Sequence, residues 1–353
     1  MSKYFDYPES SLQNEMIYDD KLEQYTKAFD IDQKAEINLF FQEYGFVIIK
    51  NVLPIDECYK TEKEIMSLMK FDKKKPSTYK KWPSFGKESE GIVCRKPLFT
   101  CQTVNNRQNE RIYSMFSRLL NSTDLQVSHD SCYFLRPTKH IKFEDNQIKT
   151  MEEWKTKKVV RLDVDIDKCY AKPEELADKL KNLSYVNLIN FICETCIFSF
   201  SVTPLNVEGL INLTNNKKSD GGFSCVPGFH KYFTEWYKHN QKNKKKKNTN
   251  SYISNLKPHL DDTKYKKYIF DENDPIKDKL VKINMKAGWL LIWDQRLPYC
   301  IEPNNSKNFW LVQKIKYSKR YNFVNNSRLL MLKKNLTYVQ KMITINKVFK
   351  NSL

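Results

Sequence analysis

The chain has 353 residues, of which 40% are hydrophobic and 13% aromatic, and its formal net charge is +18 at pH 7. A chain of this size can bury one large core or two modest ones. The longest apolar run, residues 191–202, is interrupted by Glu194, Thr195 and serines, which argues against a membrane-spanning helix. Nine cysteines without a signal-peptide-like amino terminus argue against a secreted disulfide framework. We therefore expect free thiols and a cytoplasmic protein.

Patterns in the first half of the chain predict helices that alternate with strands. Residues 1–34 are polar and aromatic without clear periodicity and predict an arm over the domain. Residues 35–44 place Ile37, Phe40 and Phe41 on one helical face, and Gly45 is typical of the residue that follows a helix. The other expected elements are a strand at 46–52, a helix at 55–70, a basic loop at 72–81, a helix at 107–120 and a strand at 125–137.

Beyond Val159 the pattern is mostly that of β-strands. Seven short segments with glycine or proline between them have strand character, namely 159–166, 191–200, 207–214, 223–228, 279–285, 288–294 and 309–317. Many short strands of this kind are typical of a double-sheet jelly roll. We therefore predict an α+β fold with a double-stranded β-helix (jelly-roll) core, flanked by helices that lie largely in the N-terminal part.

Basic residues are concentrated in two regions. The run 242–247 includes Lys244, Lys245, Lys246 and Lys247 within a polar stretch. After Glu302 there is no acidic residue, while eleven Lys or Arg follow, Lys333 and Lys334 among them. Such charge favours a polyanion, either nucleic acid or an anionic surface, through counterion release and electrostatic steering. The alternative is that these runs are only solvated loops and tails.

Three blocks of the chain resemble the phytanoyl-CoA dioxygenase-like proteins of the Fe(II)/2-oxoglutarate oxygenase superfamily. Residues 40–58 are similar to the family's opening helix, glycine, strand and second helix, and residues 213–236 to its glycine-marked turn, strand and Val-Pro-Gly turn. Residues 288–310 resemble the segment that carries the family's distal iron ligand. The resemblance implies an arm at 1–34, a domain at 35–317 with a basic insertion at about 238–274, and a basic tail at 318–353.

The resemblance also implies which residues stand at the iron-ligand positions. Active members bind iron through a His-x-Asp pair, whose side chains share one strand face, and through a histidine on a facing strand. In the matching segment 161–167, Asp163 stands at the histidine position and Asp165 keeps the carboxylate. Tyr299 stands at the distal histidine position, and no histidine follows His259. A phenol has an unperturbed pKa near 10 and is a poor ligand at neutral pH.

The anchor for 2-oxoglutarate is also replaced according to the same resemblance. The family uses an arginine there, whose planar fork holds a carboxylate with two hydrogen bonds. Trp310 stands at that position, and Lys314 or Lys316 offers only a point charge. With two iron ligands and this anchor replaced, we expect neither iron nor 2-oxoglutarate as a cofactor.

Three functions are compatible with this sequence. The first is a non-catalytic jelly-roll protein that acts as a binding or scaffolding module. The second is an active Fe(II)/2-oxoglutarate-dependent dioxygenase with an atypical metal set made of Asp163, Asp165 and Tyr299. The third is a basic nucleic-acid-binding protein. In the first case the two aspartates need compensation in a low dielectric, and Arg161 on the same strand face is expected to supply it, ahead of water or a hard cation.

Two other motifs have a structural interpretation. Cys193 and Cys196 form a CxxC, but no second close cysteine pair accompanies it, so we predict buried thiols and not a zinc site. The triplet His259-Leu260-Asp261 is a literal His-x-Asp, yet it lies in the polar insertion and no histidine follows it. We predict an exposed turn there.

Overall fold

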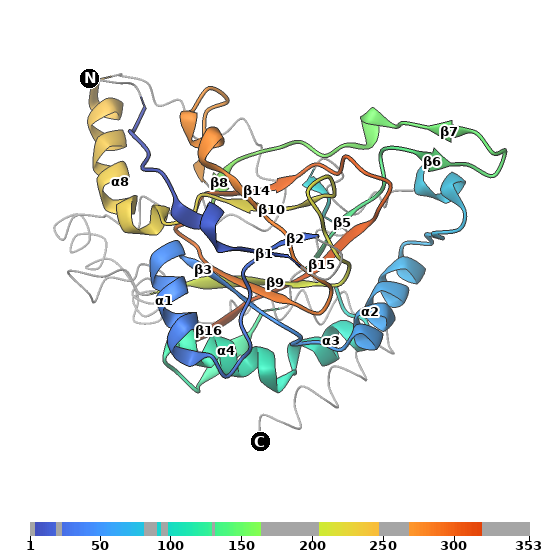
Figure 1. The fold of residues 1–353 in the computed structure, drawn as a ribbon, viewed down its shortest axis with the longest axis horizontal. Coiled ribbons are helices and arrows are strands. Elements are labelled where there is room, and N and C mark those ends of the chain that lie inside the picture. The colour runs from blue at the N-terminus through green and yellow to red at the C-terminus, as the bar shows by residue number, and fades with distance from the viewer. Residues whose placement is uncertain are drawn as a thin grey trace, which may run out of the picture.

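Two five-stranded sheets form the centre of the fold in the computed structural model, which describes residues 4–18, 23–80, 90–92, 98–128, 131–163, 205–246 and 268–319 (Figure 1). The first sheet has the order β3 (Phe46–Ile49), β13 (Leu290–Asp294), β9 (Val207–Asn212), β15 (Trp310–Ile315) and β5 (Cys132–Leu135). The second has the order β11 (Tyr268–Ile269), β8 (Arg161–Leu162), β14 (Tyr299–Glu302), β10 (Gly222–Cys225) and β12 (Val281–Ile283). Neighbouring strands run antiparallel in both sheets.

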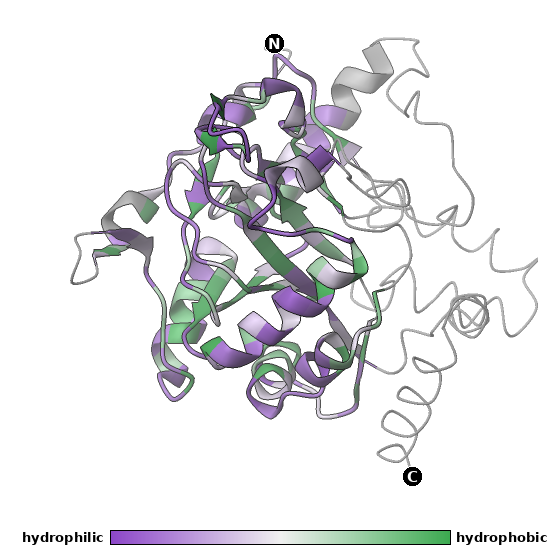
Figure 2. Cartoon of the chain, turned by 90° about the vertical axis from the view of Figure 1, so that its right-hand side faces the viewer, coloured by the Kyte–Doolittle hydropathy of each residue, from purple (hydrophilic) through white to green (hydrophobic). Residues whose placement is uncertain are grey.

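The two sheets pack face to face through aromatic side chains. The ring of Phe223 on β10 lies 4.7 Å from that of Trp293 on β13, and Tyr299 on β14 lies 5.7 Å from the same tryptophan, between ring centroids. All three side chains are almost completely buried. Figure 2 shows the apolar residues concentrated in these central strands, with polar residues on the outer segments. Such an apolar interface is the main source of stability in a two-layer fold.

Helices α1 (Lys34–Tyr44), α2 (Ile55–Leu68), α3 (Cys101–Arg107) and α4 (Glu110–Leu120) lie along the first sheet (Figure 1). The side chain of Asn109 caps α4 by accepting from two backbone N–H groups, and the helix buries an apolar face. Phe116 on that face fits against Gly209 of β9, where a Cβ would lie only 2.9 Å from the ring. In addition, Gln313 of β15 donates a hydrogen bond to the backbone oxygen of Thr103 in α3. Helices α3 and α4 therefore cover the face of the first sheet that points away from the second.

The remaining elements extend the two sheets. Helix α8 (Phe229–Lys246) follows Gly228, whose φ of +79° suits glycine, and Trp236 of α8 packs edge-on against Tyr268 of β11. Three two-stranded pairs are also formed, namely β1 (Met16–Tyr18) with β2 (Gln24–Thr26), β4 (Leu125–Val127) with β16 (Tyr317–Lys319), and β6 (Ile141–Lys142) with β7 (Ile148–Lys149). The 3-10 helices are η1 (Ser11–Glu15), η2 (Pro76–Lys80), η4 (Glu152–Trp154) and η5 (Pro275–Lys279).

The mixed α and antiparallel β class predicted from the sequence is confirmed, and most predicted elements occur within a few residues of their expected bounds. Three predictions were wrong. The helix at 107–120 is preceded by a separate helix, α3, which begins with a capping box between Thr100 and Thr103. The strand at 125–137 is two strands, and so is the strand at 309–317, because β4 pairs with β16 while β5 pairs with β15. In addition, strand β14 was missed, because no local pattern marks it in the sequence. The predicted strand at 191–200 and the insertion's residues 247–267 lie outside the described residues.

Candidate functional site

Arg161, Asp163 and Tyr299 converge between the two sheets. Arg161 on β8 is directly opposite Tyr299 on β14, so both side chains project from the same sheet face. The Tyr299 hydroxyl donates to Asp163 Oδ2 at 2.5 Å and accepts from Arg161 Nε at 3.3 Å. The guanidinium carbon lies 5.3 Å from the centroid of the Tyr299 ring. Arg161 is 6% exposed and Tyr299 is 2% exposed, so these polar groups depend on one another for hydrogen bonding.

The other two nitrogens of the guanidinium are held by residues from different parts of the chain. Arg161 Nη1 binds Glu90 Oε2 at 2.9 Å, and Nη2 donates to the hydroxyl of Tyr133 on β5 at 3.2 Å. The cation is therefore fixed from three directions, with one carboxylate and two phenols as acceptors. A rigid fork of donors suits this arrangement, whereas the point charge of lysine does not.

The electrostatics keep Arg161 charged and Tyr299 protonated. Burial opposes the charge on Arg161, but Tyr299, Tyr133, Asp163 and Glu90 together raise its pKa well above the usual value. Burial raises the pKa of the Tyr299 phenol well above its usual range, Arg161 opposes this rise, and Asp163 reinforces it. A neutral phenol next to a carboxylate acts as a hydrogen-bond donor, as the Tyr299–Asp163 contact shows.

The region predicted to anchor 2-oxoglutarate is filled by contacts within the protein. Trp310 at the start of β15 is fully buried, and its indole nitrogen donates to Asn212 Oδ1 at 3.1 Å. Lys314 and Lys316 both face Glu208, with nitrogen–oxygen distances of 3.6 Å and 3.7 Å. Gln295 donates to the same carboxylate at 2.7 Å. The positive charges near this strand therefore already have a carboxylate of the chain beside them.

The side chains described at the expected iron site include no imidazole. Iron sites of this type use two imidazoles and one carboxylate. Of the three expected positions the structure describes two, which are taken by the protonated phenol of Tyr299 and by the Asp163 carboxylate that accepts from it, and the Arg161 guanidinium beside them cannot act as a ligand. Among the residues that the structure describes, no three His, Cys, Asp or Glu side chains are grouped so that they could hold a metal ion.

The structure brings some of the predicted site residues together. Asp163 and Tyr299 are in contact, and Asp163 is among the groups that raise the pKa of Arg161. The sequence did not identify Glu90, Tyr133 or Glu208, since none of them belongs to a recognisable motif. Helix α8 ends with Lys244, Lys245 and Lys246, and only its backbone is described at this point. The other predicted residues lie outside the described residues, namely Asp165, Lys247, Lys333, Lys334, Cys193, Cys196 and the triplet 259–261.

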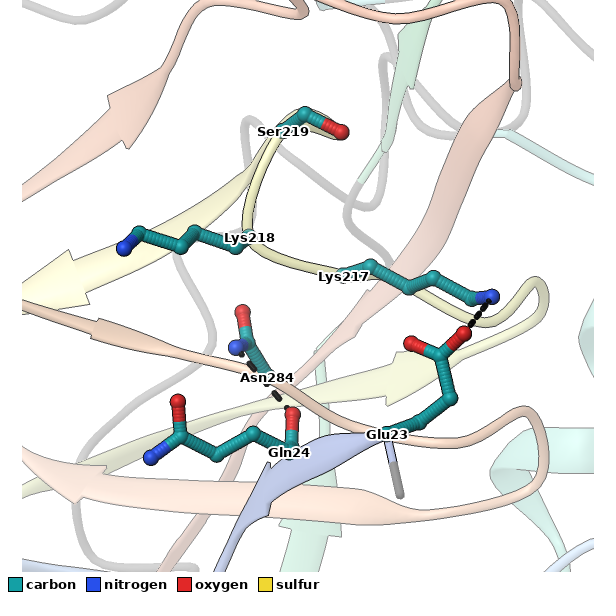
Figure 3. Close-up of a pocket in the computed structure, with 6 residues that line it drawn as sticks. All are labelled: Glu23, Gln24, Lys217, Lys218, Ser219 and Asn284. Carbon is teal, nitrogen blue, oxygen red and sulfur yellow. Dashed lines mark hydrogen bonds and ion pairs between the residues drawn. The ribbon is translucent and has the colours of Figure 1, made fainter. Parts of the chain in front are cut away.

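A pocket of about 540 Å³ lies elsewhere, beside β2 and the turn that precedes β10 (Figure 3). Its lining residues are Glu23, Gln24, Lys217, Lys218, Ser219 and Asn284. Figure 3 shows that Lys217 is paired with Glu23 and that the Asn284 amide reaches the backbone oxygen of Gln24. The pocket contains none of the predicted site residues. No helix in the described ranges is both long and apolar enough to cross a membrane.

Comparison with known proteins identifies one close relative in sequence. The chain is 30% identical over 287 residues to a Dictyostelium discoideum protein named "Putative phytanoyl-CoA dioxygenase", with 78% of this chain and 73% of that protein covered. No family model matches the chain.

The solved structures that match the chain share less sequence with it. The product of GlcNAc Inducible Gene 2 from Candida albicans is 13% identical with a TM-score of 0.49, over 81% of this chain and 64% of that one. This chain therefore spans less than two thirds of the Candida albicans protein. HygX from Streptomyces hygroscopicus, solved with nickel and 2-oxoglutarate bound, is 14% identical with a TM-score of 0.43, over 81% and 87% of the two chains. With TM-scores below 0.5, neither likeness bears on the function.

Proposed function

Because the chain belongs to the phytanoyl-CoA dioxygenase family, we propose that it is a non-catalytic member whose two-sheet core serves as a binding or scaffolding module. One observation carries the proposal. Tyr299 binds both Arg161 and Asp163 at the point where the resemblance puts the iron ligands. The core itself is interpreted as a jelly roll, because β12, β13, β14 and β15 alternate between the two sheets in chain order.

The charge of Arg161 opposes a metal ion at this point. Two unit charges about 4 Å apart interact by about 4 kcal/mol at an effective dielectric constant of about 20, and a divalent cation doubles this. A metal beside the guanidinium would therefore meet about 8 kcal/mol of repulsion from Arg161 alone. Tyr299 would in addition have to lose a proton that burial and Asp163 hold in place. These costs support a site that works without iron.

The cosubstrate region supports the same conclusion. The Trp310 ring is buried at the position of the family's arginine, and its indole N–H donates to the side-chain oxygen of Asn212. It therefore cannot hold a carboxylate with two hydrogen bonds as an arginine does. Lys314 and Lys316 share Glu208, and a dianionic cosubstrate would have to compete with that carboxylate. The side chains present here do not suit 2-oxoglutarate.

The second candidate function is an active Fe(II)/2-oxoglutarate-dependent dioxygenase. The name of the Dictyostelium discoideum relative, which is 30% identical to this chain, favours this function. Iron and 2-oxoglutarate would then be the cofactors, and Asp163 would be a ligand. The two candidates differ in a property that can be measured directly on the purified protein.

Metal content and cosubstrate turnover test the proposal. The full-length protein is purified without chelators, incubated with Fe(II), ascorbate and 2-oxoglutarate, and analysed for bound iron and for succinate. The Dictyostelium discoideum relative, treated in the same way, serves as the comparison. We expect substoichiometric iron and no succinate above the level of heat-denatured protein. One iron per chain together with 2-oxoglutarate turnover would reject the non-catalytic function.

A polyanion is proposed as a partner on the basis of the net charge of +18. Lys244, Lys245, Lys246 and Lys247 in one run, and Lys333 and Lys334 in the other, are the residues proposed to bind it. Replacing them with serine should weaken binding to heparin and make this binding less dependent on salt. Unchanged binding would show that neither run binds the polyanion.

A cytoplasmic location is proposed because the five cysteines within the described ranges are all free thiols.

A further inference from the structure

The strand pairing shows which residues occupy equivalent positions across the two facing strands. Arg161 is the residue paired with Tyr299, and Asp163 follows it after one intervening residue. Residues two apart on an extended chain project to the same side, and here both side chains contact the Tyr299 hydroxyl. Asp163 is therefore the second member of the pair that faces Tyr299, and Arg161 is the first.

On the premise of the proposed function, we infer that Arg161 and Asp163 occupy the family's His-x-Asp positions, and that the Arg161 guanidinium supplies the positive charge which a metal ion would otherwise provide between these strands. The sequence alone had assigned the pair to Asp163 and Asp165. The contacts of Tyr299 shift this assignment by two residues toward the N-terminus.

The surroundings of the guanidinium agree with such a role. Acceptors reach it from three separate segments, with Glu90 at 2.9 Å, Tyr133 at 3.2 Å and Tyr299 at 3.3 Å. A metal ion in a protein is likewise surrounded by oxygen and nitrogen atoms from several segments and tolerates no second cation at its position. Arg161 is therefore a positioning residue, because its buried positive charge holds the side chains of Tyr299, Tyr133 and Glu90 around it.

Two double variants of the full-length protein distinguish the two assignments. Arg161→His/Tyr299→His creates a His-x-Asp pair that ends at Asp163 and removes the guanidinium. Asp163→His/Tyr299→His creates a pair that ends at Asp165 and keeps Arg161. The two variants carry the same number of new histidines, so each is the matched control of the other. Co²⁺ binding is followed by the d–d absorption of the bound ion and by the thermal unfolding temperature, neither of which depends on catalysis.

We expect Arg161→His/Tyr299→His to bind one Co²⁺ per chain at least about 10-fold more tightly than the other double variant, because the other variant keeps the Arg161 charge, which repels the ion. Equal or tighter binding by Asp163→His/Tyr299→His would overturn the assignment. So would a lack of any Co²⁺ effect on the absorption and unfolding temperature of Arg161→His/Tyr299→His. If that variant folds only with Co²⁺ present, this counts as binding, and failure to fold even with Co²⁺ counts against the inference.

The wild-type protein separates this inference from the proposed function. Stoichiometric iron and turnover in the wild type would reject the non-catalytic function, whatever the variants bind. A wild type without iron, combined with no binding by Arg161→His/Tyr299→His, would reject only the role assigned to Arg161.

Discussion

Replacing Arg161 with methionine removes the buried charge while keeping a side chain of similar length. Glu90 Oε2 would lose a charge-assisted hydrogen bond, which is worth about 1.5–3 kcal/mol. The hydroxyls of Tyr133 and Tyr299 would each lose a donor worth about 1 kcal/mol. Breaking a buried ion pair by removing one partner costs about 3–5 kcal/mol as a rule, so both estimates agree. We expect Arg161→Met to lower the free energy of unfolding by about 3–5 kcal/mol.

Urea denaturation followed by tryptophan fluorescence measures this loss. Arg111→Met is the control, because Arg111 is exposed on α4 and exposed substitutions usually stay within about 0.5 kcal/mol. A loss below about 1 kcal/mol would show that the arginine contributes through the packing of its stem and not through its charge.

A double-mutant cycle with Tyr299→Phe isolates the contact between the two residues. Tyr299→Phe removes the hydroxyl that Arg161 and Asp163 share, with little change in ring packing. Residues in one hydrogen-bond network show coupling energies of about 0.5–3 kcal/mol. The two substitutions should therefore cost less together than the sum of their separate costs. Strict additivity would mean that the Arg161–Tyr299 contact carries no energy of its own.

Four further substitutions test other parts of the fold. Gly288→Ala and Gly228→Ala both place a side chain at a φ of +79°, which costs about 1–2 kcal/mol, but at Gly288 the new Cβ would also clash with the backbone oxygen of Leu53. Urea curves should therefore show the larger loss at Gly288, and equal losses would contradict the clash. Trp310→Phe leaves Asn212 Oδ1 without its indole donor and should cost about 2–4 kcal/mol by the same measurement, whereas a loss below about 1 kcal/mol would argue against this contact. Burial lowers the pKa of His230 in the folded protein. The unfolded chain therefore takes up a proton on this histidine before the folded chain does, and stability falls as the pH drops below about 6.5. His230→Asn should reduce this fall between about pH 6.5 and pH 5, and an unchanged slope would disprove the role of His230.

The helices and most central strands could be predicted because their signals are local. Gly45 ends α1 with φ at +74°, as the glycine pattern predicted, and the apolar spacing before it gives the buried face of that helix. Strand β14 has no such local signal. Its four residues are a strand because Tyr299 pairs with Cys225 on one side and with Arg161 on the other. Pairing of this kind depends on residues far apart in the chain, which periodicity does not report.

The site could be predicted only in part for a related reason. Arg161, Asp163 and Asp165 alternate along one segment, so a period of two gives them the same face in either assignment. The choice between assignments depends on which residue is opposite Tyr299, and that is a property of the sheet. Glu90 is separated from Arg161 by 71 positions in the chain, and no sequence motif links the two. Tyr299 and the basic partner Arg161 could thus be named from the sequence, whereas the register that places Arg161 opposite Tyr299 could not.

The contacts of Arg161 also determine what a single reversion can achieve. In Tyr299→His alone, the guanidinium would remain within hydrogen-bond distance of the new imidazole, and its charge would still repel a metal ion. The imidazole would have a carboxylate beside it but no second imidazole, which leaves the ligand set incomplete. We therefore expect Tyr299→His to show no Co²⁺-dependent absorption, whereas the double variant with Arg161→His shows it. Co²⁺ binding by the single variant at the affinity of the double variant would mean that the charge of Arg161 does not exclude the metal.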